Sequence, residues 1–122
     1  MNETFNEFIE DCKKSVELDP WVKERKIKGY AEELKDEVEE INEAIEKNDD
    51  SNLKEELGDV LMDWCHLCML AEKEEKFTVK DVIKSASDKL KRRKPYILDN
   101  RKVSKEEARA IWQRVKQEEK SK

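Results

Sequence analysis

The feature that most constrains this chain is its lack of residues that interrupt a helix. Only two glycines and two prolines occur in 122 residues, while 47% of the residues are charged and 36% are hydrophobic. A composition this rich in charge would by itself suggest disorder. Glycine and proline are the residues that most disfavour a helix interior, so their scarcity favours long helices instead, and we expect an all-α fold.

Apolar residues recur at helical spacing in about five stretches, which predicts about five helices with bundle-type packing. These helices are expected from Phe5 to Val16, from about Val22 to Lys47, from about Asn52 to Glu75, from Thr78 to just before Pro95, and over about 105–119. We expect all of them in a single domain that spans residues 1–122.

The second half of the third predicted helix is apolar on nearly all sides, from Met62 to Ala71. A helix that is apolar all round is normally buried, and a chain this small has few elements with which to bury it. We therefore expect homodimerisation to complete the core, with a tetramer as an alternative.

Two acidic pairs lie on consecutive predicted helices. Glu37 and Glu40 are three residues apart in the second helix, and Glu56 and Asp59 are three apart in the third. Three residues are nearly one helical turn, so each pair projects to one side of its helix. Like charges at this spacing repel, and a divalent cation between the helices, most simply Mg²⁺, would offset the repulsion.

Helical position separates these carboxylates from ordinary surface charge. Six acidic residues fall at the edge of the apolar faces or on the half of the helix that carries apolar residues: Glu33, Glu37, Glu40, Glu56, Asp59 and Asp63. Of these, Asp59 points furthest outward from its helix's apolar face, so a neighbouring helix is needed to close a site around it. A carboxylate at such a boundary is costly to desolvate, and either a metal ion or lysines across the groove would compensate it.

Gly58 lies in the interior of the third predicted helix, directly before Asp59. Glycine in a helix interior costs about 1 kcal/mol relative to alanine, so we expect another group to approach the backbone there. A packed neighbouring helix and a ligand would explain the glycine equally well.

A basic cluster ends the fourth predicted helix and consists of Lys89, Lys91, Arg92, Arg93 and Lys94. Cations stabilise a helix C-terminus, so the basic residues can be explained by helix stability alone. The same side chains would also bind phosphate, because arginine offers a planar fork of donors and lysine a mobile charge. Together with a magnesium site, such a cluster would complement a nucleoside triphosphate.

Charge and hydropathy exclude several classes of protein. The net charge of −5 disfavours non-specific nucleic-acid binding, so no nucleic-acid partner is expected. Residues 1–10 lack the apolar segment of a signal peptide, and no apolar run approaches the roughly 18 residues of a membrane span. Three cysteines, an odd number, point to reduced thiols. We therefore expect a cytoplasmic protein with no membrane contact.

Three blocks of the chain together resemble the MazG family of nucleoside triphosphate pyrophosphohydrolases, within the all-α pyrophosphatase superfamily. The family's ExxE and ExxD motifs are similar to residues 37–40 and 56–59. Residues 34–45 are similar to the family's LxEExEExxEAI stretch, residues 54–61 to its EELGDLL stretch and residues 89–96 to its KLxRRHPH segment. The resemblance covers about residues 21–96, and Trp112 is a further match. Lys94 and Tyr96 differ, because they stand where the family often has histidine.

The resemblance implies cleavage of a nucleoside triphosphate (NTP or dNTP) to the monophosphate and pyrophosphate, as house-cleaning of the nucleotide pool. The implied metal ligands for Mg²⁺, with Mn²⁺ as an alternative, are Glu37, Glu40, Glu56 and Asp59. Either Glu37 or Glu40 would orient or deprotonate the attacking water. The triphosphate would be bound by Lys89, Arg92 and Arg93, while Glu33 and Asp63 would support the metal ligands.

Two alternatives to this function stay open at the level of sequence. One is a narrower enzyme of the same superfamily that hydrolyses dCTP, dUTP or phosphoribosyl-ATP. The other is a non-catalytic helical interaction module, in which the carboxylates are surface charge and the apolar seam of the second helix binds a partner.

Overall fold

The computed structural model describes residues 1–122 as five α-helices and one short 3-10 helix, without strands. The elements are α1 (Asn2–Leu18), α2 (Pro20–Glu46), α3 (Asp50–Lys73), α4 (Val79–Arg93), η1 (Pro95–Ile97) and α5 (Lys105–Lys120). The prediction of an all-α fold with about five helices is confirmed. None of the helices combines the length and the apolar character needed to cross a membrane.

Short polar side chains set where three of the helices begin. Asp19 precedes Pro20 and accepts a hydrogen bond from the backbone N–H of Trp21 at 2.9 Å. At the start of α3, Asp49 accepts from the N–H of Asn52 at 3.1 Å, and Ser104 accepts from Glu107 in the same way at the start of α5. Each cap satisfies an N–H group that has no partner inside the helix, so these boundaries follow from local sequence.

α2 is interrupted by a kink that the sequence pattern does not predict. Lys26 has φ 62° and ψ 172°, which is not helical, so the first turns of α2 and the long segment after Lys26 are separate helical pieces. This backbone region is occupied almost only by glycine. The kink lies next to Arg25, whose side chain takes part in the candidate site described below.

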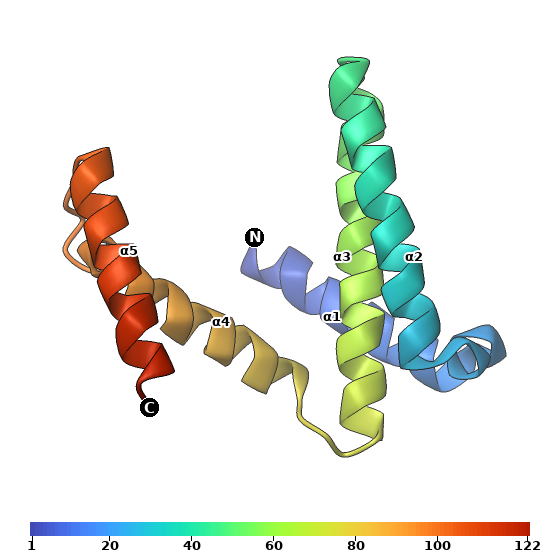
Figure 1. Cartoon of the computed structure of the whole chain (residues 1–122). Coiled ribbons are helices and arrows are strands. Elements are labelled where there is room, and N and C mark those ends of the chain that lie inside the picture. The colour runs from blue at the N-terminus through green and yellow to red at the C-terminus, as the bar shows by residue number, and fades with distance from the viewer. The chain divides into compact units, whose positions relative to one another are not determined.

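The chain packs as two compact units, residues 1–79 and residues 80–122. In the first unit, α2 and α3 lie side by side along their length and α1 crosses them (Figure 1). The buried core of this unit consists of Cys12, Val16, Val22, Tyr30, Cys65, Met69 and Leu70. These residues come from all three helices, so each of the helices contributes one face to a common core.

The second half of α3 is buried by the chain itself. Cys65, Cys68 and Met69 are each at most 5% exposed, and α1 and α2 supply the covering residues. The chain itself thus covers most of this segment, and homodimerisation stays a prediction. Met62, at the start of this segment, is 42% exposed, and exposed apolar side chains elsewhere in α2 and α3 include Val38, Ile45 and Leu57, at 49%, 55% and 53% exposure.

The second unit contains nearly all of α4, together with η1 and α5. Ile111 and Val115 are the buried residues of α5, whereas α4 has none. An ion pair between Arg101 and Glu107, at 3.1 Å, joins the segment before α5 to its first turn. The basic cluster occupies the C-terminal end of α4 in this unit.

Candidate functional site

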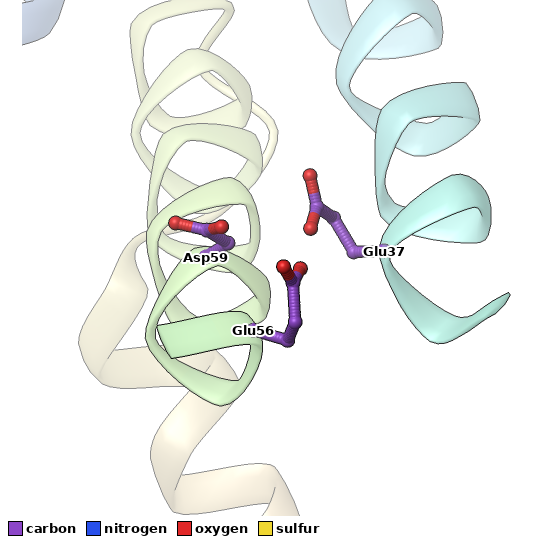
Figure 2. A group of neighbouring side chains, drawn as sticks. All are labelled: Glu37, Glu56 and Asp59. Atoms are coloured by element: carbon purple, nitrogen blue, oxygen red, sulfur yellow. The ribbon is translucent and has the colours of Figure 1, made fainter. Parts of the chain in front are cut away.

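Three of the four predicted metal ligands come together between α2 and α3. One carboxylate oxygen each of Glu37, Glu56 and Asp59 lies within 4.8 Å of the others. Glu37 reaches from α2 towards α3, and Glu56 and Asp59 come from successive turns of α3 (Figure 2). The three-residue spacing places Glu56 and Asp59 on one side of α3, and α2 closes the site from the other helix.

The cluster lacks the hydrogen-bond donors that buried carboxylates normally have. Glu56 is only 9% exposed, and its Oε2 atom is buried with no hydrogen-bond partner. The Oε2 atom of Glu37 is in the same situation. A buried carboxylate without a partner is costly, so oxygen ligands arranged in this way fit a hard divalent cation. The residues present therefore suit the magnesium ion that the sequence pattern predicts.

Crowding of negative charge shifts the protonation of these groups. The contact with Glu37 raises the pKa of Glu56, and burial adds to the rise. The hydrogen bond with Glu56 lowers the pKa of Glu37, but burial and the nearby Glu40 and Asp59 outweigh it, so the pKa of Glu37 is raised overall. Both shifts mean that the cluster resists carrying its full negative charge in the absence of a cation.

Glu40 lies beside the cluster and not within it. Its side chain is exposed, and it is not one of the three residues whose oxygens converge. A hydrogen bond with Glu56 raises the pKa of Glu40, which places the two carboxyl groups next to each other. Glu40 therefore differs from Glu37 in being open to solvent at the edge of the site.

Glu33 and Asp63 form a second carboxylate pair next to the three ligands. Asp63 is 7% exposed and its Oδ2 atom is buried without a partner. Burial raises the pKa of Asp63 to about 6, and the negative charge of Glu33 contributes further. Glu33 accepts a hydrogen bond from Arg25 at 2.5 Å, so its own charge is compensated. Glu33 and Asp63 line the same hollow as Glu37 and Asp59, and their role in supporting the metal ligands stays a prediction.

A hollow of 320 Å³ adjoins the carboxylates, and its lining includes Arg25, Tyr30, Glu33, Glu37, Asp59 and Asp63. Its volume is at the lower end of the range for small-molecule sites. The guanidinium group of Arg25 lies over the ring of Tyr30, 5.1 Å from the ring centroid. The hollow thus joins acidic groups, one arginine and an aromatic ring in a single recess.

The lining of this hollow also contains a contact between three helices that the sequence does not predict. The rings of Tyr30 and His66 stack with centroids 5.1 Å apart, and His66 Nε2 lies 3.0 Å from Ser15 Oγ. Burial lowers the pKa of His66, which favours the neutral ring. The three residues belong to α2, α3 and α1, so no local sequence signal could have grouped them.

The two glycines have different surroundings. A side chain at Gly58 would meet no atom within 4 Å, so nothing in this chain approaches the backbone closely at that point. Of the two explanations that the sequence left open for this glycine, a packed neighbouring helix of the same chain is therefore absent, and a ligand stays a prediction. At Gly29, an added Cβ would lie 2.5 Å from Cγ of Arg25. Gly29 thus provides the space in which Arg25 lies along α2 towards Glu33.

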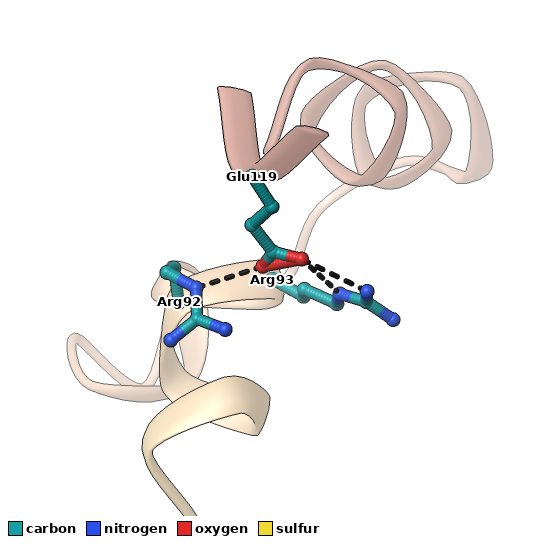
Figure 3. A network of polar contacts seen from close by, with 3 residues as sticks. All are labelled: Arg92, Arg93 and Glu119. Atoms are coloured by element: carbon teal, nitrogen blue, oxygen red, sulfur yellow. Dashed lines mark hydrogen bonds and ion pairs between the residues drawn. The ribbon is translucent and has the colours of Figure 1, made fainter. Parts of the chain in front are cut away.

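The predicted phosphate-binding residues belong to the second unit, and two of them share one partner. Arg92 Nε donates to Glu119 Oε2 at 2.8 Å, and Arg93 Nη2 donates to Glu119 Oε1 at 2.9 Å (Figure 3). The guanidinium carbon of Arg93 lies 4.8 Å from the centroid of the Trp112 ring. Lys89 is exposed. Glu119 carries no signal in the sequence that would have linked it to these arginines.

Comparison with known proteins identifies relatives over most of the chain. The model of the MazG nucleotide pyrophosphohydrolase domain matches residues 25–98. A protein named nucleoside triphosphate pyrophosphohydrolase from Escherichia coli (strain K12) is 33% identical over 103 residues, which are 84% of this chain and 39% of that protein. The uncharacterized protein YabN of Bacillus subtilis (strain 168) is 36% identical over 103 residues, or 84% of this chain and 21% of that protein.

A solved structure has the same fold. The crystal structure of a mazG-related protein from Thermotoga maritima superposes with a TM-score of 0.85 at 32% sequence identity, and covers 92% of this chain and 98% of that one. By contrast, the chain spans only 21% to 39% of the length of the two curated relatives described above.

Proposed function

Because the chain belongs to the MazG nucleotide pyrophosphohydrolase family, we propose that it hydrolyses nucleoside triphosphates to the monophosphate and pyrophosphate in a Mg²⁺-dependent reaction. The observation that carries this proposal is the convergence of Glu37, Glu56 and Asp59 within 4.8 Å. Two of these carboxylates have a buried oxygen without a hydrogen-bond donor, which a cation would satisfy.

Glu37, Glu56 and Asp59 would hold the metal ion, and Glu40 would complete the set from its edge. When bound, Mg²⁺, or Mn²⁺ in its place, would supply Lewis-acid polarisation of the phosphate oxygens and a lowered pKa of a bound water. Glu33 and Asp63 would hold the ligands in place from the next turn of each helix. The role of Asp63 is supported by its burial beside Glu33.

The group that orients or deprotonates the attacking water is proposed to be Glu40. A general base must stay partly free of the metal, and Glu40 lies outside the three converging carboxylates. Its side chain is open to solvent at the edge of the site, where it can accept a proton from a water bound beside the cluster. Glu37 is less suited to this role because its carboxylate is one of the three that converge.

The triphosphate is proposed to contact Lys89, Arg92 and Arg93. Arginine binds phosphate oxygens through two parallel N–H groups, and lysine adds a mobile positive charge. These groups would stabilise the charge that develops on the leaving pyrophosphate.

A second copy of the chain is proposed to cover part of the first unit. The support is the exposure of Val38 and Ile45 on α2 and of Leu57 on α3. Val38 and Ile45 are seven residues apart and therefore share one side of α2, and an exposed apolar stripe is typical of an interaction surface. A homodimer is the simplest assembly, and a tetramer would pair two of them. The proposed location is the cytoplasm, which rests on the odd number of cysteines.

The test of the proposed reaction is release of pyrophosphate by the purified chain with Mg²⁺ and a panel of NTPs and dNTPs. Broad release supports the proposed house-cleaning activity, whereas release from dCTP, dUTP or phosphoribosyl-ATP alone would identify the narrower enzyme. No release from any nucleotide, together with a melting temperature that is insensitive to Mg²⁺, would leave the interaction module as the better description.

A further inference from the structure

Two guanidinium groups converge on one carboxylate at the end of α4. Arg92 Nε donates to Glu119 Oε2 at 2.8 Å, while Arg93 donates to Oε1 from Nη2 at 2.9 Å and from Nε at 3.3 Å (Figure 3). Each oxygen of Glu119 therefore has its own arginine. Guanidinium groups that donate several N–H groups to a single anionic group are also the means by which arginines bind phosphate.

Arg93 is held in place by a contact that does not involve Glu119. Cζ of Arg93 lies 4.8 Å from the centroid of the Trp112 ring, and the Arg93 side chain is only 16% exposed. A cation over the face of a tryptophan is stabilised by the ring, which restricts the guanidinium group. The two arginines thus form an anion site whose present occupant is a side chain of α5.

The occupant stays charged under all ordinary conditions. Hydrogen bonds from Arg93 and Arg92 lower the pKa of Glu119 to about 2. Protonation therefore does not release the arginines near neutral pH. A second anion displaces Glu119 by accepting the N–H groups of both arginines, and a group with several negative oxygens has the advantage over one carboxylate.

We propose that Glu119 occupies the phosphate-binding face of Arg92 and Arg93 and competes with the triphosphate of the substrate for it. This inference rests on the proposed function, in which these two arginines bind the triphosphate. Glu119 then acts as a positioning residue, because a phosphate-bearing ligand binds the two arginines only after it has displaced Glu119. Triphosphates displace it more readily than monophosphates, so the product monophosphate is held less well than the substrate.

The neighbouring residue Glu118 provides a matched control. Its side chain is 65% exposed and lies 4.0 Å from Arg114, one helical turn away on α5. Glu118→Gln therefore removes the same charge from the same helix without touching Arg92 or Arg93. An effect that comes only from removing one negative charge from α5 appears in both variants. An effect that comes from freeing Arg92 and Arg93 appears only in Glu119→Gln.

The experiment is a calorimetric titration of the full chain with inorganic tripolyphosphate in the absence of divalent metal. If Glu119 masks most of the arginine pairs, Glu119→Gln should bind tripolyphosphate about three- to tenfold more tightly, because apparent affinity scales with the unmasked fraction. Glu118→Gln should bind like the unchanged chain. In an Arg93→Gln background, Glu119→Gln should give a smaller gain or none.

Enzyme kinetics give a second measurement. If the ion pairs of Glu119 only stabilised the packing of α4 against α5, removing them would not lower KM. Glu119→Gln should lower KM for a nucleoside triphosphate while kcat stays within about twofold, since only ground-state competition is removed. Tripolyphosphate binding no tighter in Glu119→Gln than in the unchanged chain, or an equal gain in Glu118→Gln, overturns the inference.

Two outcomes need a separate control: unfolding of the Glu119→Gln variant, and absence of enzymatic activity in the unchanged chain. If Glu119→Gln loses helical circular dichroism, the titration is made with Glu119→Asp, which keeps the charge but withdraws the carboxylate by one methylene; binding no tighter than in the unchanged chain then overturns the inference. Absence of pyrophosphate release by the unchanged chain would defeat the proposed function, and the tripolyphosphate titration would still decide whether Glu119 masks the arginines.

Discussion

The carboxylates of Glu37 on α2 and Glu56 on α3 face each other, and each has one buried oxygen that no hydrogen-bond donor reaches (Figure 2). Two negative groups in this relationship destabilise the metal-free chain. The same arrangement preorganises a site for a cation, since the carboxylate oxygens are already close together before the cation binds. Stability is thus lower at the place where the proposed chemistry occurs.

Glu56→Gln should abolish pyrophosphate release and raise the melting temperature of the metal-free chain. The substitution removes a ligand, and it also removes one of the repelling charges from the cluster. Initial rates of pyrophosphate release and thermal unfolding followed by circular dichroism measure the two effects. Glu55→Gln is the control, because Glu55 is the exposed neighbour. Turnover that survives in Glu56→Gln would remove Glu56 from the proposed site.

Mg²⁺ should raise the melting temperature of the chain in a saturable manner. A ligand that binds only the folded state stabilises it by RT ln(1 + [L]/Kd), or about 2.7 kcal/mol at one hundred times Kd. NaCl at equal ionic strength controls for screening. The Mg²⁺ effect should vanish in Asp59→Asn, and an undiminished effect in that variant would mean that the ion binds elsewhere.

Asp63→Asn should stabilise the metal-free chain more at pH 7.5 than at pH 4.5. The folded pKa of Asp63 is about 6 against an ordinary value of 3.8, so its contribution to stability is present below pH 3.8 and is lost as the pH rises through 6. Asparagine cannot ionise and does not suffer this loss. Denaturant unfolding at the two pH values should show a difference of about 1–3 kcal/mol between them. An effect of the substitution that is equal at both values would contradict the assigned shift.

Gly58→Ala should stabilise the chain by about 1 kcal/mol, because alanine is the better helix former and nothing lies within 4 Å of the added Cβ. Gly29→Ala is the matched comparison and should show no such gain, since Cγ of Arg25 would be 2.5 Å from the new atom. Denaturant midpoints measure both. A loss of stability in Gly58→Ala would show that a group from outside the chain, such as a second copy, packs against this turn.

Lys26→Gly should stabilise the chain, whereas Lys28→Gly should destabilise it. Lys26 has φ 62° and ψ 172°, a conformation that costs a non-glycine residue about 1–3 kcal/mol. Lys28 lies in the helical segment after the kink, where glycine costs about 1 kcal/mol. Equal destabilisation by both substitutions, measured by chemical unfolding, would mean that the backbone at Lys26 is helical in solution.

Much of the fold could be predicted from local patterns. Helix starts at Asp49 and Ser104 depend on a side chain three residues from the N–H group that it caps, and the apolar periodicity extends over each helix. The kink at Lys26 could not be predicted, because lysine has no intrinsic preference for a positive φ. Its conformation depends on the surrounding packing, which includes the contact of Arg25 with Glu33 and Tyr30.

By itself, the sequence determined which side of each helix carries the carboxylates, because a spacing of three residues sets the angle between side chains on one helix. It also determined the family, through three blocks in the right order. Only the tertiary structure decided that Glu37 meets Glu56 and Asp59 while Glu40 stays at the edge, and that Glu119 bridges Arg92 and Arg93. Periodicity places a side chain relative to its own helix, whereas the rotation and offset of one helix against another come from the packing of the whole unit.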